Sequence, residues 1–202
     1  MTILPMYPTS INEKYMELVI NILRDDGIII YPTDSLYAIG CNALNNQAIE
    51  RICRIKGINP AKTNLSIICH DISQSAEYAR IDNRAFRIMK DNLPGPFTFL
   101  LPASTTLPKV FKGRKTVGVR IPDNAIAREI AMRMDSPLLT TSIQWDTEDE
   151  AINPESIAMR YSDTVDIVID GGEGGTEPST VIDITDSSNP EIIRQGLGEI
   201  EL

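Results

Sequence analysis

The chain has 202 residues, 42% of them hydrophobic and 23% charged, and its formal net charge is −9. This length and composition predict a single globular domain over 1–202 that buries a sizeable core. The acidic balance excludes a protein whose whole surface attracts nucleic acid, so an anionic ligand needs a local basic site.

Cysteine, histidine and apolar-run patterns exclude several further classes. Cys41, Cys53 and Cys69 are odd in number and lack C-x-x-C spacing, which argues against a disulfide framework or a structural zinc site and favours buried thiols. His70 is the only histidine, so a metal centre built from several imidazoles is excluded. With no signal-like start and no long apolar run, we expect a soluble cytoplasmic protein without a membrane partner.

The N-terminal half alternates helices with short apolar strands. Ser10-Ile-Asn-Glu13 has the pattern of a capping box, and apolar residues then recur at helical spacing until Gly27. Two more helices are expected, one from Asn45 or Asn46 to Lys56, the other from Asp82 to the turn Pro94-Gly-Pro96. The strands expected in this half cover 28–31, 65–69 and 97–101.

The C-terminal half continues this alternation and then changes character. Helices are expected over 124–134 and 154–161, and strands over 116–121, 138–142, 165–169, 179–184 and 191–194. No helix separates the last two strands, which indicates an antiparallel pair added to a helix-flanked centre. The sequence therefore predicts an α/β fold with a twisted, open, mixed sheet flanked by helices.

Two loops are candidates for chemistry. Tyr31-Pro-Thr-Asp-Ser-Leu-Tyr37 leaves the carboxyl end of the first predicted strand, where open α/β sheets place ligands; the alternative is a turn in which Asp34 or Ser35 caps the next element. Asp170-Gly-Gly-Glu-Gly-Gly175 resembles a phosphate loop in glycine content alone, because it lacks the G-K-[ST] ending and leads into a strand. We expect it to be a mobile loop.

Three basic positions require different interpretations. Arg120 lies in an otherwise apolar strand pattern, so its charge needs an anionic partner, which is either a protein carboxylate or a ligand phosphate. Lys112-Gly-Arg-Lys115 reads as a solvated turn. Lys56 is favoured at a helix C-terminus by the dipole; pairing it with Ser142 as base and nucleophile would lack an orienting third group.

Seven sequence blocks resemble the YrdC/YciO superfamily, in order and across nearly the whole chain. They are Tyr31-Pro-Thr-Asp-Ser-Leu-Tyr37, Arg54-Ile-Lys-Gly57, Pro94-Gly-Pro-Phe-Thr98, Val117-Gly-Val-Arg-Ile-Pro122, Thr140-Thr-Ser142, Pro178-Ser-Thr-Val181 and Ile193-Arg-Gln-Gly196. The resemblance implies a YrdC/RibB-like sheet around a basic concavity. Its synthase branch joins L-threonine, bicarbonate and ATP into threonylcarbamoyl-AMP for tRNA modification, and double-stranded RNA binding is also ascribed to the superfamily.

The resemblance also implies roles for individual residues. Lys56 and Ser142 match catalytic positions. Thr33, Tyr37 and Arg120 match substrate-binding positions, and Ser179, Thr180 and Arg194 match nucleotide-binding positions. No dedicated metal site is visible, so Mg²⁺ would arrive with ATP.

The chain departs from the synthase pattern at two positions. Ile58 stands where the synthase branch has an arginine, and Gln144 stands where it has an asparagine. Loss of one fixed cation beside a leaving pyrophosphate typically reduces the rate by on the order of 10²–10³. The sequences of segments 51–55 and 82–90 resemble the YciO branch more than the synthase branch.

Three functions are compatible with these observations. The first is a YciO-like protein that binds a nucleotide and threonine in one cavity, with weakened nucleotidyltransferase activity as a threonylcarbamoyl-AMP synthase. The second is a non-enzymatic module for double-stranded RNA, which the net charge of −9 disfavours as a broad surface property. The third is an enzyme that removes the threonylcarbamoyl group from tRNA.

Overall fold

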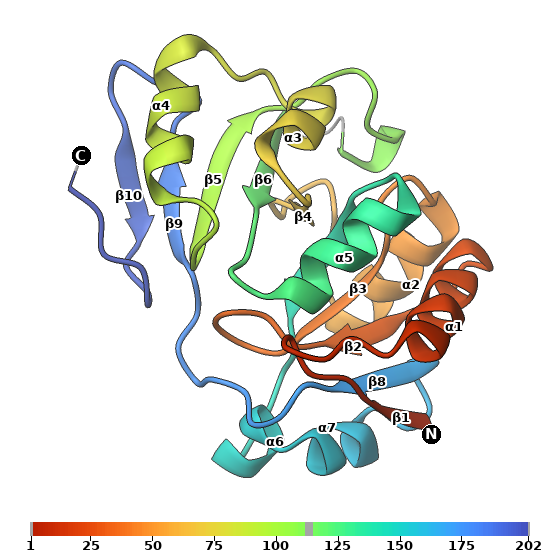
Figure 1. Cartoon of the computed structure of the whole chain (residues 1–202). Helices are drawn as coiled ribbons and strands as arrows, with labels where there is room; N and C mark the ends of the chain where they lie inside the picture. Colours follow the sequence, from red (N-terminus) through yellow and green to blue (C-terminus); the bar gives the residue numbers. More distant parts are fainter. Residues whose placement is uncertain (1, 112–114, 202) are drawn as a thin grey trace.

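In the computed structural model, which describes residues 2–111 and 115–201, ten strands form one sheet in the order β1-β8-β2-β3-β7-β4-β6-β5-β9-β10 (Figure 1). The strands are β1 (Thr2–Pro5), β2 (Ile29–Tyr31), β3 (Ala38–Asn42), β4 (Ser66–Ile68), β5 (Phe97–Pro102), β6 (Thr116–Arg120), β7 (Leu138–Ser142), β8 (Ile167–Asp170), β9 (Thr180–Asp183) and β10 (Glu191–Arg194). The helices are α1 (Glu13–Arg24), α2 (Asn46–Lys56), α3 (Ile72–Tyr78), α4 (Asn83–Asn92), α5 (Ala125–Met134), α6 (Glu148–Ile152) and α7 (Pro154–Arg160), with a 3-10 turn at Lys109–Phe111.

The predicted mixed sheet is confirmed. Strands β1 and β2 pair with β8 in parallel, as do β4 with β6 and β5 with β9. The remaining pairs are antiparallel, including the C-terminal pair of β9 and β10. The expectation that this last pair extends a helix-flanked centre is therefore correct.

Helices cover both faces of the centre of the sheet. Successive side chains of a strand point to opposite faces, and in β2 Ile30 belongs to one apolar cluster while Ile29 and Tyr31 belong to the other. Buried residues of α1 and α5 complete the second cluster, and those of α2 and α7 join the first. This two-sided burial explains why the run at β2 is uniformly apolar.

Caps of two helices agree with the sequence, and one differs. Asn45 and Asp82 cap α2 and α4, and Gly57 ends α2 with φ +63°. Helix α1 is capped by Asn12, whose side chain accepts from Tyr15 N, so the predicted capping box is wrong. The reason is tertiary: the Glu13 carboxylate pairs with Arg133 at 2.6 Å instead of returning to the cap.

Two strands, β1 and β3, two helices, α3 and α6, and the 3-10 turn at Lys109–Phe111 were not predicted. Strand β3 contains Gly40 and has no strong alternation, but pairing on both sides with β2 and β7 stabilises it. Helix α3 lacks apolar periodicity and begins with the Asp71 cap, which accepts from Gln74 N. Short elements of this kind depend on tertiary contacts more than on their own pattern.

The three thiols are buried, as predicted. Burial raises the pKa of all three, that of Cys69 to about 12. Of the helices in the described residues, none is long and apolar enough to cross a membrane.

Candidate functional site

A cleft of about 240 Å³ opens beside the centre of the sheet. Hydroxyl side chains and two arginines dominate its wall, which includes Ser35, Ser66, Thr98, Arg120, Thr140, Ser142, Ser179 and Arg194. No carboxylate belongs to the part of this wall that the structure describes. The cleft is therefore suited to an anion or to a ligand rich in oxygen acceptors.

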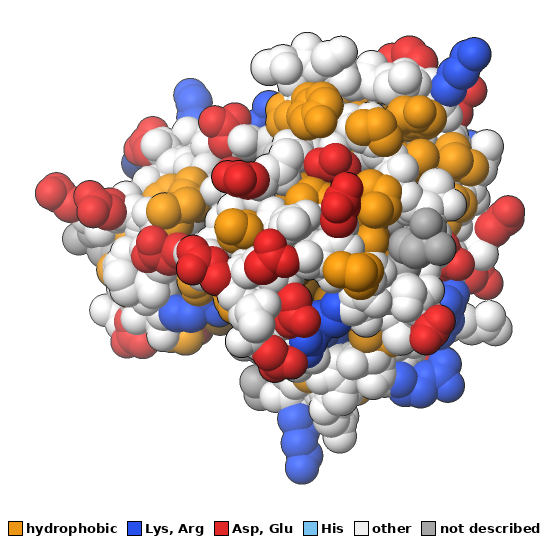
Figure 2. Space-filling model, turned by 90° about the horizontal axis from the view of Figure 1, so that it is seen from below, with side chains coloured by type: hydrophobic (Ala, Val, Ile, Leu, Met, Phe, Trp, Pro, Cys, Tyr) orange, Lys and Arg blue, Asp and Glu red, His pale blue; other side chains and the backbone are white. Residues whose placement is uncertain are grey.

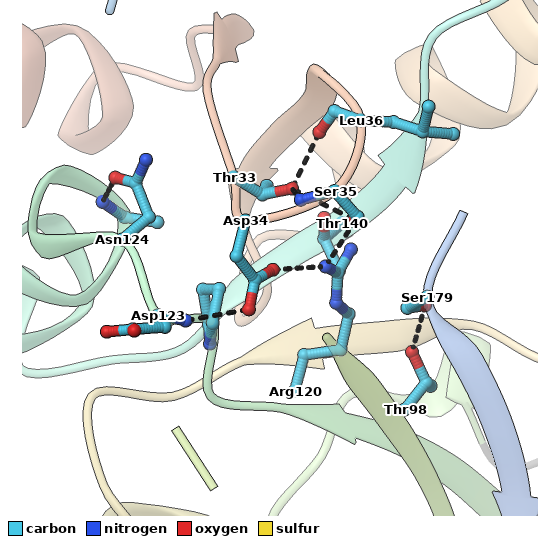
Figure 3. A network of polar contacts seen from close by, with 12 residues as sticks. Thr33, Asp34, Ser35, Leu36, Thr98, Arg120, Asp123, Asn124, Thr140 and Ser179 are labelled. Atoms are coloured by element: carbon cyan, nitrogen blue, oxygen red, sulfur yellow. Dashed lines mark hydrogen bonds and ion pairs between the residues drawn. The ribbon is translucent and has the colours of Figure 1, made fainter. Parts of the chain in front are cut away.

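The partner of Arg120 is a protein carboxylate. Its Nη2 lies 3.2 Å from Asp34 Oδ1 and donates to Ser35 Oγ at 3.0 Å, and the arginine and aspartate side chains are only 10% and 8% exposed. The second oxygen of Asp34 accepts from Asp123 N at 2.8 Å. Figure 3 shows Asp34 and Ser35 converging on the guanidinium, so the pair ties the loop after β2 to the end of β6.

Burial lowers the pKa of Arg120, and the charge of Asp34 opposes that effect. The Nε atom of Arg120 is buried without a hydrogen-bond partner. Of the two possibilities that the sequence left open, a carboxylate or a phosphate, the structure shows the carboxylate, so Arg120 contributes little net charge to the cleft.

Arg194 supplies net positive charge to the cleft. Its Nη2 donates to Ser179 O at 2.7 Å and to Ser179 Oγ at 3.4 Å, and Ser179 Oγ lies 2.9 Å from Thr98 Oγ1. Within the described residues, no carboxylate forms an ion pair with Arg194. Burial, followed by the charge of Arg120, lowers the pKa of Arg194. Arg194 belongs to an exposed strand, and a cation at the wall of a cleft with neutral partners only can bind an anion.

Lys56 lies at the edge of the cleft beside Ser142. Its Nζ donates to the backbone oxygen of Ser142 at 2.5 Å, and burial lowers its pKa. The bond is to the carbonyl and not to the hydroxyl, so the structure does not show the base and nucleophile pair considered above. The Ser142 side chain itself lies in the cleft wall.

The hydroxyls of Thr33 and Tyr37 are used within the protein. Thr33 Oγ1 donates to Leu36 O at 2.6 Å and accepts from Ser35 N, which stabilises the turn. The Tyr37 hydroxyl donates to Gly172 O at 2.7 Å and accepts from Gly171 N. Tyr37 lines the cleft, whereas Thr33 lines a neighbouring cavity of about 480 Å³.

The glycine-rich segment 170–175 is held by the loop after β2. Besides the two bonds to Tyr37, Gly175 N donates to Ser35 O and Gly174 N donates to Ile152 O. A Cβ atom on Gly174 would lie 2.5 Å from the Tyr37 ring. The loop is hydrogen-bonded and closely packed in this structure, and Gly174 and Gly175 are explained by the close approach of Tyr37 and Ser35.

Replacing Gly174 by alanine should lower the free energy of unfolding by about 1–3 kcal/mol, because the added methyl group overpacks the Tyr37 ring. Chemical denaturation measures this change. The neighbouring exposed residue provides a control, and Glu173→Ala should change stability by less than about 0.5 kcal/mol. Equal stabilities for both variants would show that the loop is not closely packed.

Of the remaining predicted positions, one lines the cleft and two lie outside its wall. Ile58 lines the cleft. Gln144 is exposed and does not line the cleft, and its backbone N donates to the Tyr161 hydroxyl at 2.7 Å. Thr180 is fully buried, and its hydroxyl donates to Gly198 O at 2.6 Å, so it anchors the C-terminal segment.

Several lining residues were missed as individual candidates, including Ser66, Thr98 and Thr140. Thr98 and Thr140 lie in blocks noted for their family resemblance, but hydroxyls in strands give no local signal of a shared cavity. Figure 2 shows one face of the molecule, on which acidic side chains are scattered. The Lys and Arg side chains on this face do not form a continuous basic patch. The basic turn expected at 112–115 lies largely outside the described residues.

A family model described as "Telomere recombination", for the Sua5, YciO and YrdC proteins, matches residues 21–196. The chain is 38% identical to the uncharacterized protein YciO of Escherichia coli (strain K12) over 199 residues, which cover 97% of this chain and 96% of YciO. The crystal structure of E. coli YciO has a TM-score of 0.90 to this structure, with 98% of both chains covered.

The threonylcarbamoyl-AMP synthase of Pyrococcus abyssi (strain GE5 / Orsay) is 32% identical over 208 residues, covering 100% of this chain and 60% of the synthase. P. abyssi Sua5 in complex with L-threonine has a TM-score of 0.87 and 30% identity, covering 97% of this chain and 58% of Sua5. With a family match over most of its length, the chain belongs to the Sua5/YciO/YrdC family and is related to the threonylcarbamoyl-AMP synthases.

Proposed function

We propose that this protein binds L-threonine and the phosphates of ATP in the cleft and forms threonylcarbamoyl-AMP slowly. The observation that carries the proposal is Arg194, an exposed cation in a hydroxyl-lined wall that forms no ion pair with a carboxylate of the described residues. Support also comes from the relative that was crystallised with L-threonine and shares this fold at 30% identity.

The proposed reaction has two steps. The threonine amine adds to CO₂ derived from bicarbonate, giving a carbamate and a proton. A carbamate oxygen then attacks the α-phosphorus of ATP, and the bond to pyrophosphate breaks. Negative charge develops on the leaving pyrophosphate, so fixed cations increase the rate. Among the described residues, Arg194 in the cleft wall and Lys56 beside Ser142 are cations suited to this role, and Mg²⁺ enters with the ATP substrate.

Ile58 explains why the proposed reaction is slow. Its side chain occupies the cleft wall close to the C-terminus of α2, two residues after Lys56. An aliphatic group there cannot donate to a phosphate oxygen. The cleft therefore retains a binding site for the nucleotide while lacking one donor to the transition state.

The test is to mix the purified protein with L-threonine, bicarbonate and ATP–Mg²⁺ and to measure pyrophosphate. Release that requires threonine supports the proposal, and omission of threonine is the control. No release, together with loss of threonylcarbamoyl groups from a modified tRNA, would favour the removing enzyme instead. Binding of duplex RNA without either reaction would favour the non-enzymatic module.

Arg194→Gln should weaken ATP binding about tenfold, because it removes a cation of the cleft wall whose partners in the described residues are neutral. Isothermal titration calorimetry at fixed salt measures the dissociation constant. Arg87→Gln, which removes an exposed charge on α4, is the matched control and should change the affinity less than twofold. Equal losses in both variants would mean that net charge, and not the cleft, governs binding.

A further inference from the structure

We propose that Tyr161 is a positioning residue: its hydroxyl holds the backbone that follows β7 and, through the Ser142 carbonyl, keeps the Lys56 ammonium at the edge of the cleft. The inference rests on the function proposed above, in which Lys56 is a cation beside the leaving pyrophosphate. In the sequence, Tyr161 is only the last residue of the helix expected over 154–161.

The Tyr161 hydroxyl forms two hydrogen bonds with the backbone of a single residue. It accepts from Gln144 N at 2.7 Å and donates to Gln144 O at 3.2 Å. The N and O atoms of one residue belong to two successive peptide units, so the hydroxyl holds the units on both sides of the Gln144 Cα atom. Gln144 itself is exposed, so without the hydroxyl these two groups would bond to solvent.

The preceding peptide unit, which joins Ser142 to Ile143, is held from two other elements. Its carbonyl oxygen accepts from Lys56 Nζ at 2.5 Å. Its N–H group donates to Tyr37 O at 3.2 Å. Three successive peptide units therefore have partners, the last two through Tyr161. Because neighbouring units share a Cα atom, release of the last two would loosen the carbonyl that Lys56 uses.

Tyr161 is itself held firmly by its surroundings. The residue is 6% exposed and belongs to the apolar cluster that includes residues of α2 and α7, and its carbonyl oxygen accepts from Thr164 N and Val165 N. The residue before it, Arg160, pairs with Asp146 at 2.8 Å. The end of α7 therefore holds the segment after β7 at two places, one buried and one exposed.

This arrangement determines where the charge of Lys56 lies. A lysine ammonium has three protons on a flexible four-carbon stem, and here one of them is directed to Ser142 O. Within the described residues, no other recorded hydrogen bond or ion pair uses the Lys56 ammonium. A fixed carbonyl therefore places the ammonium while leaving protons for the oxygens of a bound phosphate.

The first test measures threonine-dependent release of pyrophosphate by Tyr161→Phe, which keeps the ring and removes the hydroxyl. The value of kcat should fall about three- to tenfold and KM for L-threonine should change less than twofold, because Lys56 acts on charge that develops in the transition state. Tyr78→Phe removes the hydroxyl of another buried tyrosine outside the cleft wall, and this matched control should leave kcat unchanged.

A double-mutant cycle with Lys56→Met shows whether Tyr161 acts through the lysine. In the Lys56→Met background, Tyr161→Phe should reduce kcat less than twofold, because the group that it positions is absent. If Lys56→Met is too slow to assay, the cycle is measured on the dissociation constant of pyrophosphate–Mg²⁺, the product that carries the developed charge. Equal losses in both backgrounds would overturn the role assigned to Tyr161.

Trp145, the single tryptophan of the chain, gives a readout that does not depend on activity. It follows Gln144 directly and packs, partly buried, against the same apolar cluster as Tyr161. Tyr161→Phe should increase acrylamide quenching of its fluorescence about twofold, because the segment opens locally, whereas Tyr78→Phe should not. Unchanged quenching in Tyr161→Phe would show that the hydroxyl does not hold this segment and would overturn the inference.

The remaining outcomes separate this inference from the proposed function. If the unmodified chain releases pyrophosphate and Tyr161→Phe has the same kcat, the inference is overturned and the proposed function stands. If the unmodified chain releases no pyrophosphate, the proposed function fails and the inference fails with it, whatever the fluorescence shows.

Discussion

Asp34→Asn is expected to lower the free energy of unfolding by about 3–5 kcal/mol, because it leaves the buried guanidinium of Arg120 without its counter-charge. Asparagine has nearly the same shape as aspartate, so the loss reports charge and not volume. Urea denaturation followed by circular dichroism measures the change. The loop after β2 should also loosen, since Asp34 holds it to β6 and to Asp123 N.

Two comparisons make this result interpretable. Asp123→Asn removes an exposed carboxylate, 74% accessible, that pairs with Arg128 at 3.4 Å, and it should change stability by less than about 1 kcal/mol. Adding Arg120→Met to Asp34→Asn should recover part of the loss, because no unpaired buried charge remains. If the single Asp34 variant is as stable as the unmodified chain, the pair has no structural importance.

Ile58→Arg is expected to increase threonine-dependent pyrophosphate release by on the order of 10²-fold, because it adds a cation to the cleft wall that also contains Arg194. The effect should appear in kcat more than in KM, since the charge it stabilises develops in the transition state. Steady-state kinetics with ATP–Mg²⁺ and L-threonine separate the two parameters.

Gln144→Asn provides the comparison for Ile58→Arg. Gln144 is exposed and lies outside the cleft wall, so this single change should alter the rate less than about threefold. An Ile58→Lys variant supplies charge without the planar fork of donors and should give a smaller gain than arginine. A folded, ATP-binding Ile58→Arg variant with no gain would show that the chain lacks synthase chemistry for another reason.

The sequence predicted most of the helices and strands because their signals are local. Apolar spacing and the caps Asn45 and Asp82 located α2 and α4 without knowledge of their neighbours. The capping box at Ser10 failed because Glu13 has a stronger partner in Arg133, 120 residues away. Strand β3 failed because its stability comes from two pairing strands and not from its own pattern.

Some features of the candidate site could likewise be predicted from the sequence, and others could be found only in the tertiary structure. By itself the sequence determined that a charge at Arg120 needs an anion, that the chain resembles one superfamily, and that Ile58 replaces a cation. Only the tertiary structure decided that the anion is Asp34, that Tyr37 bonds to Gly172, and that Thr180 lies outside the cleft. Asp34 and Arg120 are 86 residues apart, and Tyr37 and Gly172 are 135 residues apart. Which side chains meet across such separations depends on the order of the strands in the sheet. Local pattern specifies an element, whereas a cavity is made of contacts that no local pattern encodes.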